Sequence, residues 1–399
     1  MNEDRSDQPT TTTATAATRE DLPAFLSRPL PGFQAQPSAR LLSDPPDPSG
    51  LGAPVWFRGA DDGFVVDEVP AYLPSGVGEH LYLHIRKAGI STPEIWKRLR
   101  SAFGVKEIEI GTAGQKDARG VTSQWISVPA RLVEPRISEV ESALGVTLLE
   151  AKRHNNKLRL GHLRGNRFTC RLDDVTDADT VILRARAQAL ADQGCPNLFG
   201  AQRFGHGDRA LREAERFLAR PRYAKTKREQ FWVSALQSAI FNVWLAARVQ
   251  EQTWASAVDG DVMEKRSGAP FECTDPVVDA VRAAAGEVSP TGPLFGRAMR
   301  CAQRDALTRE SRSLEGLGVF RDALLAHPAF PTGTRRSARL WAEDVVVQGA
   351  AGVCTVSFTL PAGSYASVFL RELVGPRLRD LFFHPPVVPA SAALVSDDD

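Results

Sequence analysis

The sequence predicts a fold that combines β-strands with α-helices. Residues 63–73, "GFVVDEVPAYL", and 80–89, "HLYLHIRKAG", alternate apolar and polar side chains, the pattern of two strands joined by a Gly/Pro loop. Residues 92–104, "TPEIWKRLRSAFG", place apolar side chains every fourth residue and end in glycine, which predicts a helix with Thr92 as its N-cap. A second helix is expected over 228–250. Its predicted buried side consists of Trp232, Leu236, Ile240, Val243 and Leu245.

The remaining elements follow from the same signals. Residues 106–114, "KEIEIGTAG", predict a strand that runs into a glycine-rich loop, and 122–128, "TSQWISV", predict a strand that leaves it. The Gly/Pro punctuation of 286–296, "GEVSPTGPLFG", predicts a loop. Residues 351–373 predict a strand, a tight loop and a helix in that order.

The composition is that of a globular protein with one large domain or two of ordinary size. The chain has 399 residues, 43% of them hydrophobic, and a formal net charge of +1 that gives no global signal for a charged partner. No 18-residue apolar run and no signal-peptide core is present, so we expect no membrane span and a cytoplasmic location. The polar, proline-rich residues 1–48 and the tail 386–399 are expected to be disordered.

Neither a metal site nor a disulfide framework is predicted. Five cysteines lie far apart without CxxC spacing, which favours packing roles for all of them. His80 and His84 fall in "GEHLYLH", which is not the HExxH pattern and indicates a strand. No P-loop is present, and no GxGxxG stands between a strand and a helix, so no cofactor is expected.

One carboxylate, Asp117, stands between Lys116 and Arg119 in the glycine-rich stretch 111–125, "GTAGQKDARGVTSQW". The residues alone leave two readings open. A solvated turn uses such side chains freely. A catalyst that needs one ionised carboxylate, held on a loop between two strands, would use them as well.

Two stretches are strongly basic in an otherwise nearly neutral chain. Residues 151–171 carry seven Lys/Arg and no acid, and 203–228 carry nine Lys/Arg against three acids. Either stretch alone is most simply a solvated face. Together, and with aromatic residues among them, they favour RNA binding through phosphate contacts and base stacking. The basic residues singled out for RNA in the first stretch are Lys152, Arg153, Lys157 and Arg159.

Six blocks in order resemble the TruD-type tRNA pseudouridine synthase family. They are "FVVDEVPAYLPSGVGEHLYLHIRKAG", "GTAGQKDARGVTSQW", "KLRLGHLRGNRF", "CPNLFGAQRFG", "FWVSALQSAIFN" and "FTLPAGSYASVFLREL". They lie within the span from about residue 55 to 374 and leave both ends of the chain uncovered.

The resemblance implies an α+β fold. A pseudouridine synthase catalytic domain, with a mixed, mostly antiparallel sheet and flanking helices, would occupy 49–199 plus 345–385. An α/β insertion domain of the TruD type, 200–344, would interrupt it. The implied substrate is tRNA, with a uridine of the D arm, position 13, as the target. The isomerisation breaks the bond from ribose C1′ to uracil N1 and forms one to C5, which changes no oxidation state and needs no metal or cofactor.

The resemblance also implies roles for individual residues. Asp117 matches the catalytic carboxylate, which either attacks C1′ or removes a ribose proton, and Arg58 matches a cation facing it. Phe168 matches an active-site aromatic, and Asn166 matches the polar residue beside it. Further matches are Gln124 behind the loop, Lys116 as a supporting residue or phosphate contact, and Arg203 and Phe204 at the domain junction, where they would touch RNA or hold the two domains together.

The chain departs from the family pattern at two positions, and two rival functions stay open. Leu198 replaces a tyrosine in "PNYFG", and Ser367 replaces a threonine but keeps the hydroxyl. One rival function is an RNA-binding or RNA-folding protein on the same scaffold, without turnover. The other is the same isomerisation on a different RNA.

Overall fold

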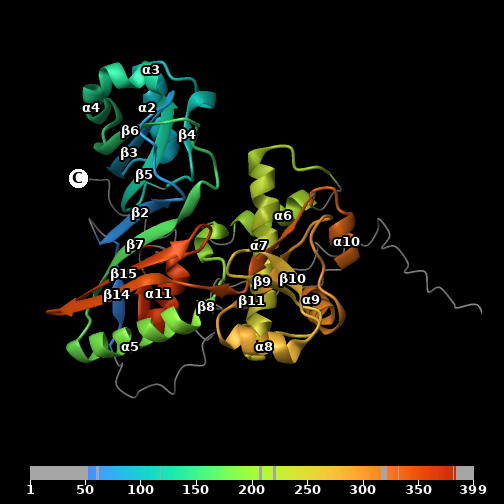
Figure 1. Cartoon of the computed structure of the whole chain (residues 1–399). Helices are drawn as coiled ribbons and strands as arrows, with labels where there is room; N and C mark the ends of the chain where they lie inside the picture. The colour runs from blue at the N-terminus through green and yellow to red at the C-terminus, as the bar shows by residue number, and fades with distance from the viewer. Residues whose placement is uncertain are drawn as a thin grey trace, which may run out of the picture.

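A computed structural model describes residues 53–59, 63–116, 118–205, 209–218, 222–315, 321–330, 332–380 and 382 of the chain. The two predicted disordered segments, 1–48 and 386–399, lie outside these residues. The described part contains two main sheets, each with its own helices (Figure 1), and one two-stranded sheet.

The larger sheet is mixed and mostly antiparallel, as expected. Its main path runs β14 (Glu343–Ala350), β15 (Val353–Pro361), β7 (Leu163–Asp173), β2 (Phe64–Pro70), β5 (Val121–Pro129), β3 (His80–Ala88) and β6 (Thr147–His154). Only the β2–β5 pair on this path is parallel. Three short strands join it: β1 (Val55–Phe57), β16 (Leu378–Asp380) and β4 (Gly111–Thr112). The strands expected over 63–73, 80–89 and 122–128 are thus β2, β3 and β5.

Two groups of helices cover different halves of this sheet (Figure 1). Helices α2 (Thr92–Phe103), α3 (Ala130–Val133) and α4 (Val140–Leu144) share a hydrophobic core with β3 and β5. Helices α5 (Asp177–Gln193) and α11 (Ala366–Val374) share another with β7 and β15. The expected order of strand, tight loop and helix over 351–373 is confirmed by β15 and α11.

Helix α2 begins as predicted, but its N-cap is Ser91 rather than Thr92. The Ser91 hydroxyl accepts a hydrogen bond from the backbone N–H of Glu94 at 3.4 Å. Gly104 ends the helix in the left-handed conformation, with φ 68°. The Thr92 hydroxyl is therefore free of the capping role and serves another one, described below.

The strand predicted over 106–114 is wrong for most of its length. Residues Glu107–Glu109 form a 3₁₀ turn, η2, and only β4 is extended. The Glu109 carboxylate accepts from the Lys106 backbone N–H at 3.0 Å and closes the turn. Ile108 is 80% exposed, so the apparent Ile108–Ile110 alternation does not mark a sheet face.

The smaller sheet has the order β10 (Pro270–Glu272), β9 (Val262–Lys265), β11 (Val288–Leu294) and β12 (Thr334–Ser337). Its helices are α6 (Arg209–Leu218), α7 (Lys227–Gln250), α8 (Pro276–Ala284), α9 (Arg304–Glu315) and α10 (Arg321–Ala326). A two-stranded link joins the two halves of the molecule, β8 (Cys195–Pro196) pairing with β13 (Arg339–Leu340). None of the described helices is long and apolar enough to cross a membrane.

Helix α7 confirms the helix predicted over 228–250, with a wider buried surface than expected. Leu236, Ile240 and Leu245 are buried as predicted, whereas Trp232 and Val243 are only partly buried. Buried residues surround α7 because three hydrophobic clusters meet it. One includes Leu236 and Ile240, another includes Leu245, and the third includes Ala235 and Ala239.

The loop predicted over 286–296 is wrong, since this segment forms the buried strand β11. Strand β11 pairs with β9 through Val288–Pro290 and with β12 through 291–294, so Pro290 lies where the strand changes its partner. Proline has no backbone N–H to donate there, but the Pro290 carbonyl still accepts from the Ala338 N–H at 2.8 Å. Gly292 is needed for close packing, because a Cβ there would lie 2.3 Å from the Trp244 ring.

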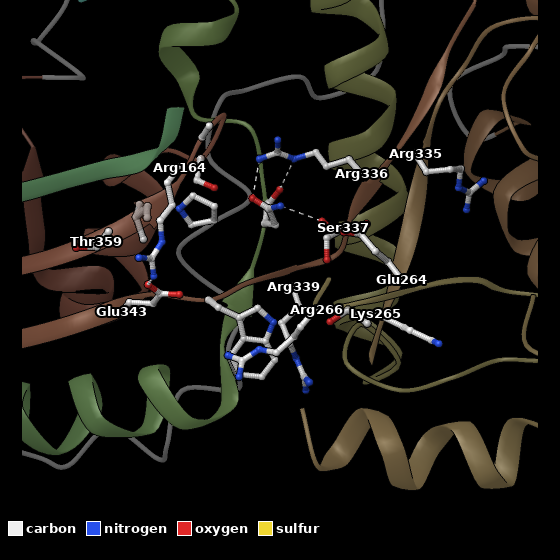
Figure 2. A pocket seen from close by; sticks show the side chains of 17 residues that line it. Arg164, Glu264, Lys265, Arg266, Arg335, Arg336, Ser337, Arg339, Glu343 and Thr359 are labelled. Carbon is white, nitrogen blue, oxygen red and sulfur yellow. Dashed lines mark hydrogen bonds and ion pairs between the residues drawn. The ribbon is translucent and has the colours of Figure 1, made fainter. Parts of the chain in front are cut away.

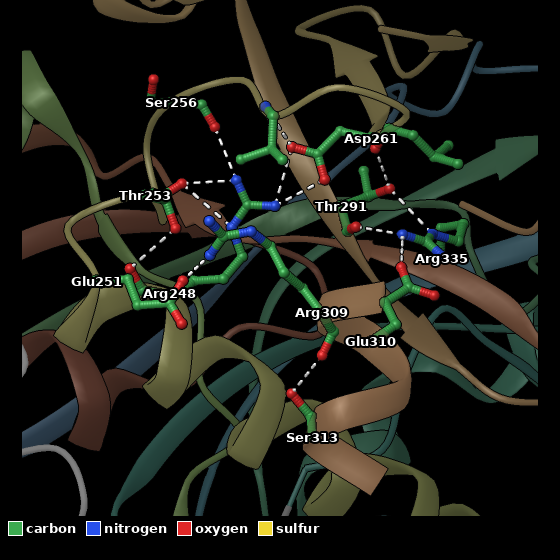
Figure 3. A network of polar contacts seen from close by, with 12 residues as sticks. Arg248, Glu251, Thr253, Ser256, Asp261, Thr291, Arg309, Glu310, Ser313 and Arg335 are labelled. Atoms are coloured by element: carbon green, nitrogen blue, oxygen red, sulfur yellow. Dashed lines mark hydrogen bonds and ion pairs between the residues drawn. The ribbon is translucent and has the colours of Figure 1, made fainter. Parts of the chain in front are cut away.

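A buried polar network connects the smaller sheet to its helices (Figure 3). The Arg248 guanidinium donates to both carboxylate oxygens of Asp261, at 2.7 and 2.9 Å. Arg335 on β12 donates to Glu310 of α9 at 2.7 Å and to Thr291 of β11. These paired charges tie α7, α9 and the sheet into one unit.

Candidate active site

A pocket of about 510 Å³ lies where β2 and β7 meet the 115–119 loop and the start of α11. Its lining consists of Phe64, Val66, Gln115, Lys116, Ala118, Arg119, Thr122, Asn166, Phe168, Gln202, Ser364, Tyr365, Ala366 and Phe382. Asp117 itself lies outside the described residues. Its two sequence neighbours, Lys116 and Ala118, both line the pocket.

The chain on each side of position 117 is held by backbone hydrogen bonds. The Lys116 N–H donates to the Thr92 hydroxyl at 2.8 Å, and the Lys116 carbonyl accepts from the Thr92 N–H at 3.2 Å. The Ala118 carbonyl accepts from the Gly89 N–H at 3.1 Å. The end of β3 and the start of α2 therefore fix both flanks of the loop.

Gln124 supports this arrangement from inside the sheet. Its side chain is fully buried, and its Oε1 accepts from the Thr92 hydroxyl at 2.9 Å. Thr92 is fully buried too, so solvent does not compete for these bonds. Gln124 thus contacts the residue that anchors Lys116, one step behind the pocket.

The Lys116 ammonium points into the protein. It donates to Asn166 Oδ1 at 2.5 Å and lies 3.4 Å from the Glu68 carboxylate. The Lys116 and Glu68 side chains are 8% and 1% exposed. Burial raises the pKa of Glu68, and the charge and hydrogen bond of Lys116 oppose that shift. This geometry favours a supporting role for Lys116 over the contact with phosphate considered above.

Phe168 belongs to both the pocket wall and the core. Its ring stacks between Phe64, at a centroid distance of 6.1 Å, and Phe358, at 5.4 Å. It is 7% exposed, and the exposed part faces the pocket together with Phe64. Asn166, two residues earlier on β7, lies on the same side of the strand. The structure therefore brings Lys116, Asn166 and Phe168 together.

Arg58 is placed elsewhere. Its guanidinium lies 3.2 Å from Asp173 and 3.6 Å from Asp174, and over the Trp56 ring at 5.1 Å. It is not among the residues that line the pocket. Arg119 is the guanidinium that does line it, and it donates to the Phe382 carbonyl at 2.9 Å.

Sequence reasoning missed Arg119, Gln202 and Tyr365 as pocket residues. Arg119 stands two positions after Asp117, and this spacing was a usable signal. Tyr365 precedes α11, where burial raises the pKa of its phenol. Gln202 accepts from the Ser367 hydroxyl at 3.1 Å, which shows one use of the hydroxyl kept at that position. No local pattern joins Gln202 or Tyr365 to residue 117.

Arg203 and Phe204 pack against helices of the segment 200–344. Arg203 donates to Ser234 at 2.8 Å and to Ser238 at 3.2 Å, both on α7. Phe204 is 2% exposed inside a hydrophobic cluster, so its ring has no open face for a base. Leu198, the residue that replaces a tyrosine, is also buried against α7.

The other basic residues lie on and after β6, at the edge of the large sheet. Lys152 and Arg159 are exposed. Arg153 is paired with Glu134, whose pKa it lowers through a hydrogen bond, and Lys157 donates to the Ile108 carbonyl. Lys152 and Arg159 are thus the better placed of the four for a phosphate. No group of three or more His, Cys, Asp or Glu within the described ranges could hold a metal ion.

Comparison with known proteins assigns the chain to a family. A family model for tRNA pseudouridine synthase D (TruD) matches residues 49–224 and 210–373. The chain is 43% identical to the tRNA pseudouridine synthase D of Anaeromyxobacter sp. over 327 residues, covering 80% of this chain and 92% of that protein. It is 39% identical to the Thermus thermophilus enzyme of the same name over 334 residues, covering 82% and 90%.

A solved structure agrees at the level of the fold. A Methanosarcina mazei protein that carries the same family name superposes with a TM-score of 0.62 at 21% identity, covering 82% of this chain and 94% of that one. The family model and the relatives place the chain among the pseudouridine synthases, which are isomerases. The chain belongs to the TruD family of these enzymes.

Proposed function

We propose that this protein isomerises a uridine in the D arm of tRNA, at position 13, to pseudouridine, with Asp117 as its single catalytic carboxylate. Membership of the TruD family supports the coarser part, the isomerisation of uridine in tRNA. The proposal adds the target position, the catalytic residue and a cytoplasmic location. It also assigns 49–199 plus 345–385 to the catalytic domain and 200–344 to the insertion.

The observation that carries the proposal is the pocket around position 117. Its volume of about 510 Å³ falls in the range of about 300–1,000 Å³ typical of small-molecule sites, so it suits a single base. A target base must leave its stack, which costs a few kcal/mol. Phe64 and Phe168 line one wall of this space, and aromatic contact with the base there would offset part of that cost.

The chemistry needs an ionised carboxylate next to C1′. The Arg119 guanidinium lines the pocket and would favour the charged form of an acid at position 117. The Lys116 ammonium is engaged with Glu68 and Asn166, so it would act by fixing the loop. Both roles of Asp117 considered above, attack on C1′ and removal of a ribose proton, use the same ionised group.

Site mapping on a defined RNA tests the target. A tRNA transcript with uridine at position 13 is incubated with the full chain, and pseudouridine is located by carbodiimide modification and primer extension. The proposal predicts one modified position in the D arm and none in a transcript with cytidine at position 13. Modification at another position only would contradict the D-arm assignment and favour a different RNA site.

A further inference from the structure

A second cavity, of about 740 Å³, lies between the two sheets (Figure 2). One side is formed by the start of β7 and by β14 and the end of β15, and the other by β9, β11, β12 and β13. Among the described residues, only Ser364 lines both this cavity and the pocket near position 117. The junction cavity is therefore a separate space.

The lining of the junction cavity is strongly basic. It contains six cationic side chains and two carboxylates. Arg164 is neutralised by Glu343 at 2.7 Å, and Arg335 by Glu310 at 2.7 Å. Glu264 is the remaining carboxylate of the lining, and burial raises its pKa, which weakens it as a counter-ion.

Arg336 is desolvated without a carboxylate partner in the described ranges. Its three hydrogen bonds go to neutral oxygens, the Asn197 carbonyl at 3.0 Å, Asn197 Oδ1 at 2.6 Å and the Gly363 carbonyl at 3.1 Å. Burial lowers its pKa to about 10. An anion that reached this partly buried cation would stabilise it.

Arg339 is the second such cation, and Arg266 lies close to it. Arg339 is 7% exposed, donates to the Ala283 carbonyl at 2.8 Å, and has a buried Nε without an acceptor in the part of the chain that the structure describes. Burial, and then the charge of Arg266, lowers the pKa of Arg339 to about 10. Both guanidiniums lie on the Trp341 ring, at 4.9 Å for Arg339 and 4.3 Å for Arg266.

We propose that the junction cavity is an anion-binding site in which Arg266, Arg336 and Arg339 hold a phosphate-bearing ligand. Guanidinium groups match the geometry of phosphate oxygens and bind them in a forked manner. Trp341 orients two of the three guanidiniums, and the cavity has room for more than one phosphate. The phosphate belongs either to the backbone of bound tRNA or to a free anion such as pyrophosphate. Neither source depends on the catalytic role of Asp117.

The first test is direct binding of pyrophosphate to the full chain by isothermal titration calorimetry. Arg266→Gln is the variant of choice, because Arg266 is exposed and its loss leaves the core intact. Removing one charge-assisted contact should weaken binding about tenfold. Arg312→Gln, an equal charge change on the exposed side of α9, is the matched control and should bind as the wild type does.

The second test measures tRNA affinity at several salt concentrations for the same three proteins. If the phosphate belongs to tRNA, Arg266→Gln binds tRNA several-fold more weakly, and the slope of log K against log salt becomes shallower by about 0.9 for the lost contact. If the ligand is a free anion, tRNA affinity is unchanged and only the calorimetric effect appears.

Weaker binding by Arg266→Gln in either assay supports the site. The tRNA assay then shows whether the phosphate belongs to tRNA or to a free anion. Equal behaviour of wild type and Arg266→Gln towards both pyrophosphate and tRNA would overturn the proposal. Thermal unfolding of each variant without ligand verifies that the fold is preserved.

Discussion

The Lys116 ammonium lies 3.4 Å from the Glu68 carboxylate, with both side chains almost entirely removed from solvent. Lys116 sits on the pocket loop and Glu68 on β2, so this ion pair fastens the loop to the centre of the large sheet. It is therefore the first target for mutation.

Glu68→Gln should destabilise the protein by about 3–5 kcal/mol, because it leaves the buried Lys116 charge without its counter-ion. The measurement is the free energy of unfolding in urea. Glu94→Gln, which breaks the more solvent-accessible pair with Arg98, is the control and should cost less than about 1 kcal/mol. Equal losses in the two variants would show that the buried pair does not stabilise the loop.

Thr92→Val should lower the single-turnover rate by about 10- to 100-fold with little change in tRNA affinity. The substitution keeps the shape but removes the hydroxyl that accepts from Lys116 N–H, so the loop shifts relative to the bound base. Thr92→Ser keeps the hydroxyl and should retain most of the rate. A wild-type rate in the valine variant would mean that this hydrogen bond does not position the loop.

Phe168→Leu should reduce kcat/KM by about 5- to 100-fold, the equivalent of about 1–3 kcal/mol of lost transition-state stabilisation, because it reshapes the aromatic wall of the pocket. Phe358→Leu is the matched control, because Phe358 stacks on the other side of Phe168 and does not line the pocket. The control should lose stability and keep kcat/KM. The role of Phe168 in the pocket wall is contradicted if both variants lose activity in proportion to stability.

The lowered pKa of Asp179 predicts how the stability of the protein depends on pH. Burial alone would raise its pKa, but hydrogen bonds from Arg377 and Thr176 and the Arg377 charge bring the pKa below the usual 3.8. A depressed pKa means that its stabilisation is present above pH 3.8 and is lost as pH falls through the lower, folded-state pKa. The stability difference between wild type and Asp179→Asn should therefore shrink below pH 3.8.

Urea unfolding of both proteins between pH 7 and pH 3 measures that difference. Asp177→Asn, an exposed acid in the same first turn of α5, is the control and should show no comparable pH dependence. A wild-type advantage that grows below pH 3.8 would contradict the assignment.

Local pattern was enough for the elements with a strong hydrophobic period. Helix α2 and strands β2, β3 and β5 follow directly from residue spacing. The pattern failed at 106–114, where a side chain caps a turn, and at β11, where prolines lie in a strand. At 106–114 the deciding contact is local, three residues apart, but the apolar alternation hides it. At β11 the pairing with β9 and β12 decides the structure, and no short window contains those partners.

The candidate site likewise contains some residues that local motifs predict and others that only the folded structure reveals. The family motifs placed Lys116, Asn166 and Phe168 in one pocket, and the structure brings them together. Tyr365 and Gln202 come from segments far along the chain and reach the pocket only through folding. Arg58 matches a motif by spacing, and the structure pairs its guanidinium with Asp173; its role opposite Asp117 stays a prediction, because residue 117 lies outside the described ranges.

The most direct measurement of the central claim is tritium release from tRNA labelled at uridine C5, with chelator present and no cofactor added. The isomerisation must expel the C5 hydrogen when C5 bonds to C1′. The account predicts release by the wild type, loss of release by Asp117→Asn with tRNA affinity kept within several-fold, and normal release by the control Asp192→Asn. Release at the wild-type rate by Asp117→Asn would contradict it, and tight binding by the wild type without release would favour an RNA-binding protein on the same scaffold.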